Sequence, residues 1–229
     1  MISKWRWREL LPTLILVVII TLLWRVSVAS WLVYPFRLLG TFVHELCHGV
    51  AALVTGGEFL RFAVHADLSG LAWSRGGTRW VVASAGYVGS ALWGGVLLVL
   101  AARDVSPRLL LYAMSAALLS LSLLLVGNVF GLLAATLLSS ALFFAGRYLS
   151  VGASLWWLRL LAVMLTFDSV GSLFDLLWSS GNGGATTDAH LMAQATGVPA
   201  IIWSLLWSAV SLCVIGVSFV AAFRRTIDA

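Results

Sequence analysis

TFVHELCHGVAALVTGG (residues 41–57) places two histidines and one glutamate inside an otherwise apolar stretch. The surrounding segment 29–55 is long and apolar enough to cross a membrane as a helix. Ionisable side chains are costly inside a membrane span, so their presence there points to a function. The stretch therefore predicts a membrane-embedded helix that carries a polar site.

The composition of the whole chain agrees with this prediction. Apolar residues make up 61% of the 229 residues and charged residues 10%, whereas a soluble domain carries about 25% charged residues. The net charge of +5 comes mostly from arginines scattered at the ends of apolar segments, where they are expected to act as membrane anchors. Because the arginines are not gathered on one face, nucleic-acid binding is not expected. We expect an integral, multi-pass protein of a bilayer, in the plasma membrane of a prokaryote.

Seven segments have the length of about 20 mostly apolar residues that a span needs. Helices are expected, because backbone groups in lipid must be hydrogen-bonded within their own segment. The break between the fourth and fifth segments depends only on VGNVFG (126–131). The fold class predicted is therefore an all-α membrane protein, one polytopic domain over 1–229 with six to seven transmembrane helices and a short β-hairpin. The expected spans are 10–24, 29–55, 79–102, 107–126, 128–146, 154–179 and 199–223.

Two connections between the spans have recognisable patterns. Residues 56–77 contain two short alternating strands, EFLRFAVH and GLAWS, between pairs of glycines, which predicts a hairpin at the membrane interface. Residues 179–199 predict a glycine-rich loop followed by a short helix with Thr186 or Thr187 as its N-cap.

The stretch His44-Glu45-Leu46-Cys47-His48 matches the pattern H-E-x-x-H. On a helix, residues four apart lie one above the other, so both imidazoles can bind one metal ion. Zinc suits two histidine nitrogens plus a carboxylate, with a fourth position left for water. The glutamate then serves as the general base and acid. A purely structural polar network is the alternative, and Cys47 is expected to point away and pack.

Three segments together resemble a known family: FVHELCHGVAALVTGGEFLRFAV (42–64), ASAGYVGSALWGG (83–95) and SLFDLLWSSGNGGATTDAHLMAQATGVPAIIWSLLW (172–207). They are similar to the site-2 protease type of intramembrane zinc metallopeptidase, and most to a small branch without PDZ or CBS modules. The resemblance implies one Zn²⁺ per protomer. It also implies that a later aspartate completes the metal site and that the hairpin presents an extended substrate. The residues so implied are His44 and His48 as metal ligands, Glu45 as acid/base, and Phe59, Phe62, Ala63 and Val64 as substrate-presenting residues.

The third ligand has to be chosen, because the Asp-Gly pair that carries it in the usual family does not occur in this chain. Asp168 and Asp175 lie seven residues apart in the expected span 154–179, on roughly one helix face. Asp175, in SLFDLLW, matches the related branch best and is the predicted ligand. Asp188, in TTDAH, also matches, although its place in the first turn of a short helix suits a capping role. Asp188 and Asp168 remain the alternatives, with His190 as a further one.

Two other features are interpreted as structural. The small residues Ala85, Gly86, Gly89, Ser90, Gly94 and Gly95 have the spacing that lets two helices approach closely, and we expect them to face the metal-bearing helix. His65, in the hairpin, is interpreted as a solvated strand residue.

The sequence thus predicts a zinc-dependent intramembrane endopeptidase. Its partner would be a membrane-spanning protein or peptide that it cleaves in or near the transmembrane segment. Two alternatives stay open: a proteolytically silent metal-binding scaffold or chaperone, and a small cation transporter, which would favour inverted repeats.

Overall fold

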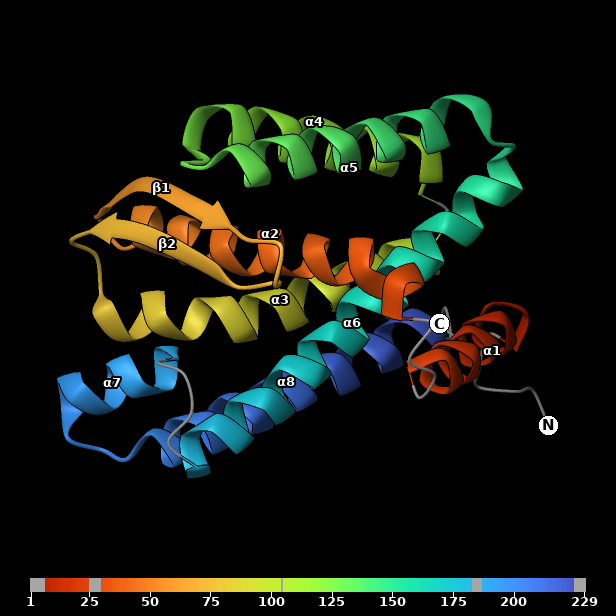
Figure 1. The fold of residues 1–229 in the computed structure, drawn as a ribbon. Coiled ribbons are helices and arrows are strands. Elements are labelled where there is room, and N and C mark those ends of the chain that lie inside the picture. Colours follow the sequence, from red (N-terminus) through yellow and green to blue (C-terminus); the bar gives the residue numbers. More distant parts are fainter. Residues whose placement is uncertain (1–6, 25–29, 104, 183–186, 225–229) are drawn as a thin grey trace.

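The computed structural model describes residues 7–24, 30–103, 105–182 and 187–224 (Figure 1). This part of the chain is helical except for one β-hairpin, which lies between the second and the third helix. The elements are α1 (Trp7–Trp24), α2 (Ser30–Val54), β1 (Glu58–Val64), β2 (Gly70–Arg75), α3 (Arg79–Ala101), α4 (Pro107–Leu125), α5 (Val129–Tyr148), α6 (Val151–Asn182), α7 (Asp188–Thr196) and α8 (Ala200–Phe223).

The helices coincide closely with the apolar segments expected from the sequence. The break inside 126–131 is confirmed, because α4 ends at Leu125 and α5 begins at Val129. Among the described residues, α3, α4, α5 and α8 are long and apolar enough to cross a membrane. The structure therefore supports a helical membrane protein with four candidate spans, and the six to seven spans remain a prediction.

Helix α3 is the centre of the assembly, packed against α2, α6 and α8. Its small residues allow these close contacts. A Cβ atom on Gly89 would lie 2.7 Å from Sγ of Cys47 on α2, and Cβ atoms on Gly94 and Gly95 would meet side chains of α6 and α8. The expected approach to α2 is confirmed at Gly89, whereas Gly94 and Gly95 face α6 and α8 instead. The buried Cys47 is a packing residue as predicted.

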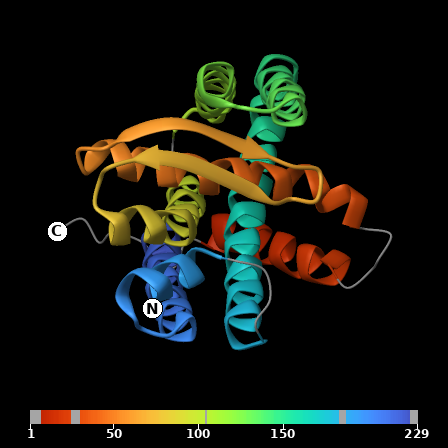
Figure 2. The ribbon, with the colours of Figure 1, turned by 60° about the vertical axis from the view of Figure 1, so that its left-hand side comes forward.

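The predicted hairpin is present and lies along α2 (Figures 1 and 2). β1 and β2 pair antiparallel, with Val64 opposite Gly70 and Phe62 opposite Ala72. Phe62 is fully buried and packs edge-on against Phe42 of α2, with 6.0 Å between ring centroids. This contact fixes the hairpin to the helix that carries the histidines.

The outer edge of β1 is occupied by the turn between α4 and α5. The side chain of Asn128 donates to the Val64 carbonyl (2.8 Å) and accepts from the Val64 N–H (3.3 Å). The Gly127 N–H donates to the Phe62 carbonyl at 2.7 Å. An exposed strand edge is a template for pairing with another chain, and here that template is blocked at β1.

The tip of the hairpin is also held in place. The Tyr34 hydroxyl donates to the carbonyl of Ala66 (2.8 Å), and the Thr41 hydroxyl donates to the carbonyl of Leu68 (3.0 Å). Both donors come from α2. The hairpin is therefore held in place both along the outer edge of β1 and at its tip.

Helix α7 begins as predicted, with Thr187 as its N-cap. His190 accepts a hydrogen bond from the Thr187 backbone N–H at 3.4 Å and lies 3.0 Å from its hydroxyl. The capping role that the sequence suggested for Asp188 is thus taken by this pair. Ala189 and Met192 are buried against α3, α6 and α8, which docks α7 beneath α3.

Candidate active site

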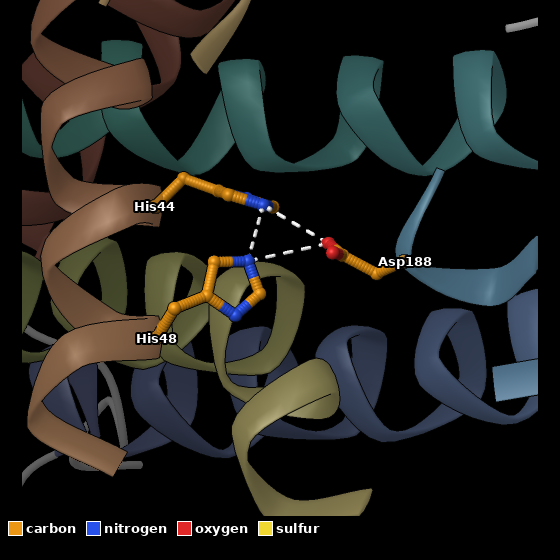
Figure 3. A group of neighbouring side chains, drawn as sticks. All are labelled: His44, His48 and Asp188. Atoms are coloured by element: carbon orange, nitrogen blue, oxygen red, sulfur yellow. Dashed lines mark hydrogen bonds and ion pairs between the residues drawn. The ribbon is translucent and has the colours of Figure 1, made fainter. Parts of the chain in front are cut away.

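Two histidine side chains project from the same face of α2 (Figure 3). His44 and His48 are one helical turn apart, and their Nε2 atoms lie 3.0 Å from each other. His48 is buried and His44 is partly exposed. The H-E-x-x-H pattern therefore does in this fold what its spacing predicts, and brings two potential ligand atoms together.

A carboxylate from α7 completes the group. Oδ2 of Asp188 lies 3.3 Å from Nε2 of His44 and 3.2 Å from Nε2 of His48 (Figure 3). Burial raises the pKa of the Asp188 carboxyl, but the adjacent His48 and His44 rings outweigh this and hold its pKa well below the usual range. The group is therefore ionised near neutral pH, as a metal ligand must be.

The three atoms fit a zinc ion. Zinc is bound by histidine nitrogens and carboxylate oxygens at about 2.0–2.1 Å in tetrahedral geometry, which separates ligand atoms by about 3.3–3.4 Å. The observed separations of 3.0, 3.2 and 3.3 Å are close to this value. Among the described residues, His44, His48 and Asp188 form a group of this kind.

The backbone of α3 sets the orientation of one ligand. Nδ1 of His48 lies 2.6 Å from the carbonyl oxygen of Val82. A carbonyl can only accept, so Nδ1 carries a proton, and Nε2 is the ring atom that faces His44 and Asp188. Metal-binding histidines nearly always have such a partner on the second nitrogen.

Glu45 follows His44 on α2 and lies next to the hairpin. Its carboxyl is buried, and a Cβ atom added to Gly70 at the start of β2 would collide with it. Glu45 does not belong to the three-residue metal group. Its carboxyl lies against β2 and lines the same cavity as His44, His48 and Asp188.

A cavity of about 860 Å³ opens over these groups. One wall is β2, with Gly70, Leu71 and Ala72, and the opposite wall is α7, with Leu191 and Ala195. Pockets of about 300–1,000 Å³ are typical of ligand-binding sites. The cavity can therefore hold a short extended segment of a chain against the histidines.

The other predicted site residues lie elsewhere. Asp168 and Asp175 belong to α6, and their side chains are outside the described residues. The prediction of Asp175 as ligand stays untested, while its alternative Asp188 lies at the histidines. His65 is exposed beside the hairpin turn, as expected.

The hairpin residues expected to present substrate are not at the cavity. Phe62, Ala63 and Val64 are buried in β1, and Phe59 is half-buried against the Phe62 ring. The strand that borders the cavity is β2. The hairpin thus borders the cavity through β2, and which of its residues present a substrate stays a prediction.

Several residues of the site could not be found from the sequence. The Val82 carbonyl has no side-chain signature, and Gly70 was expected only as the first residue of the strand GLAWS. Gly86 belonged to the small-residue run, but its contact is with the histidines themselves: a Cβ atom there would collide with Nε2 of His44. The spacing of small residues was the one signal that pointed toward this contact.

A model of Peptidase M50B-like proteins matches residues 13–218. The chain belongs to the Peptidase M50B-like family. No curated protein and no solved structure matches it. The M50B-like proteins are of the site-2 protease type, so the family implies a membrane protease.

Gly86 is expected to be essential to this M50B-like site. In Gly86→Ala the new methyl group meets the metal-facing edges of His44 and His48, and overpacking of this kind costs about 1–3 kcal/mol. We expect the variant to fold but to bind zinc substoichiometrically, which elemental analysis of purified protein measures. Gly216→Ala in α8 is the control, because its Cβ atom would meet nothing within 4 Å. Full zinc occupancy in Gly86→Ala would contradict the described geometry.

Proposed function

We propose that this protein is a zinc-dependent intramembrane endopeptidase that hydrolyses a peptide bond in or near the transmembrane segment of a substrate. The observation that carries the proposal is the meeting of His44, His48 and Asp188 at the cavity that Glu45 also lines. The M50B-like family supports a protease, and the four apolar helices support a membrane location.

Each residue has a distinct task in this proposal. His44, His48 and Asp188 hold one zinc ion per protomer, and Asp175 or Asp168 would take the place of Asp188 in the alternative ligand sets. When bound, zinc supplies Lewis-acid activation of water and of the scissile carbonyl. Glu45 accepts the proton of the attacking water and then donates it to the leaving amine. Its burial beside Gly70 keeps it at a fixed position for both transfers.

The free side of β2 is where a substrate chain would be held. In an antiparallel pair, residues alternate between those bonded to the partner strand and those whose N–H and C=O point outward. Phe62 and Val64 direct theirs outward to the α4–α5 turn, so their partners Ala72 and Gly70 direct theirs to the opposite side. That side is the cavity.

A substrate segment can therefore add to β2 as a third strand. Strand addition satisfies the backbone of an unwound segment, while pockets select its side chains. An unwound span in a membrane needs such partners, because lipid offers none. The substrate we propose is a membrane-spanning protein or peptide, and the location is the plasma membrane of a prokaryote.

Metal dependence tests the proposal without knowledge of the natural substrate. The purified chain, in lipid vesicles with a pool of synthetic single-span peptides, is expected to contain one zinc per protomer and to cleave members of the pool. A zinc chelator should abolish cleavage, and added zinc should restore it. Mass spectrometry of the peptides and elemental analysis of the protein are the measurements.

His44→Ala is the matched variant, since it removes one ligand from the same helix. It is expected to lose both zinc and cleavage. A parent protein that stays metal-free after incubation with zinc would overturn the proposal. Stoichiometric zinc without cleavage of any peptide in the pool would favour a metal-binding scaffold.

A further inference from the structure

The two metal-binding histidines are oriented in different ways. His48 is held through Nδ1 by the Val82 carbonyl. Within the residues that the structure describes, no hydrogen bond is seen at Nδ1 of His44. Ligating histidines need a fixed ring orientation for tight metal binding, and for His44 the ring packing supplies a constraint beside its contacts at Nε2.

Tyr87 of α3 packs directly on His44. The two rings meet edge to face, with 4.7 Å between centroids and an interplanar angle of 87°. The His48 ring meets His44 at the same 4.7 Å, with an angle of 75°. His44 is therefore confined by two rings set nearly perpendicular to it. Tyr87 directly follows Gly86 in the sequence. The same turn of α3 therefore leaves room for the Nε2 atoms of His44 and His48, at Gly86, and packs on the His44 ring, through Tyr87.

Tyr87 is itself held by a buried aromatic residue. The Trp207 ring of α8 stacks on it at 5.7 Å and 20°, and Trp207 is 2% exposed. Trp207 in turn packs on Trp203, whose Nε1–H donates to the Thr196 hydroxyl at the end of α7. Tyr87 cannot turn away from His44 unless this packing is broken.

The same packing positions the third ligand. Ala189 and Met192, on the buried face of α7, form one cluster with Trp207, and Tyr87 packs against that cluster from α3. Asp188 is the residue next to Ala189. Tyr87 thus contacts His44 on α2 and, through the cluster, the short helix that begins with Asp188.

We propose that Tyr87 is a positioning residue of the metal site, whose flat ring sets the orientation of His44 and its alignment with Asp188. This inference rests on the proposed metal-dependent function. It assigns to Tyr87 a role that neither the H-E-x-x-H pattern nor the carboxylates reveal. The ring, and not its volume alone, is the feature that matters.

Metal affinity and cobalt spectroscopy test this role in the full chain. Tyr87→Leu is expected to bind zinc about 10–100-fold more weakly in competition with a chromophoric chelator, the loss typical of a partner that orients a ligand. Its cobalt-substituted form should show shifted visible absorption bands. Tyr87→Phe keeps the ring and should restore both affinity and spectrum. Tyr112→Leu, in a tyrosine that packs on Phe143 away from the site, is the matched control.

The outcomes separate this inference from the function on which it rests. A parent without metal overturns both. A parent that binds zinc, with Tyr87→Leu of equal affinity and unchanged cobalt bands, overturns the role of Tyr87 alone. A Tyr87→Phe variant as weak as Tyr87→Leu also overturns it, because the ring would then not be the active feature. If Tyr87→Leu does not fold, Tyr87→Met gives the same test, since methionine fills the space flexibly without a flat ring.

Discussion

Glu45→Gln is expected to lower the cleavage rate about 10²–10⁴-fold, the contribution typical of a general acid–base group. Glutamine keeps the shape of the side chain beside Gly70 but cannot accept a proton. Because Glu45 lies outside the group formed by His44, His48 and Asp188, zinc should remain at one ion per protomer. Single-turnover cleavage in vesicles and elemental analysis of the same sample measure the two effects together.

The control for Glu45→Gln is Glu58→Gln. Glu58 is exposed at the start of β1, where its carboxylate lies 3.8 Å from Arg75. The same chemical change there should leave cleavage and zinc content unaltered. Undiminished cleavage in Glu45→Gln would show that another residue transfers the proton. Loss of zinc in that variant would instead make Glu45 part of the metal site.

Asp188→Ala has the second large expected effect, the loss of bound zinc. Residues that merely orient a ligand contribute about 10–100-fold to metal affinity, so removal of a ligand should weaken zinc binding by more than about 100-fold. The two histidines would then face the cavity without the carboxylate that lies 3.2 and 3.3 Å from their Nε2 atoms. Zinc competition titrations on purified protein give the affinity.

Asp175→Ala and Asp168→Ala test the two alternative ligands from α6, and Asp67→Ala is the neutral control. Asp67 is exposed in the hairpin turn and accepts hydrogen bonds from Ser69. We expect parent-like zinc affinity in all three. If Asp175→Ala loses zinc while Asp188→Ala keeps it, α6 supplies the ligand and Asp188 is an ion-pair partner of the histidines.

Much of the fold could be predicted from the sequence, because a helix in a lipid bilayer has to meet a few simple physical conditions. A membrane helix must be long, apolar and hydrogen-bonded within itself, so the helix bounds could be predicted within a few residues. The hairpin followed from strand alternation between glycine pairs. The histidine pair followed from helix geometry, since residues 44 and 48 share a face wherever the helix packs.

From the sequence, Asp188 ranked below Asp175 as the third metal ligand, and the reason is physical. The cost of burying a charge favoured aspartates within a span, such as Asp175, over one in a connecting segment. Helix α7 is brought to the site by tertiary packing, through the buried Ala189 and Met192, and no local pattern encodes where a nine-residue helix docks. The same holds for β2: alternation predicts two strands, but the α4–α5 turn determines which strand edge remains open.

The separation of the two halves of the metal site along the chain has a consequence for biosynthesis. His44 and Asp188 are 144 residues apart. At about 5–20 residues per second, translation of that interval takes roughly 7–30 s. With Asp188 as the third ligand, a nascent chain that already presents His44, Glu45 and His48 in the membrane cannot yet assemble its hydrolytic centre. On the proposed function, hydrolysis of neighbouring chains at the site of insertion can begin only after α7 has docked.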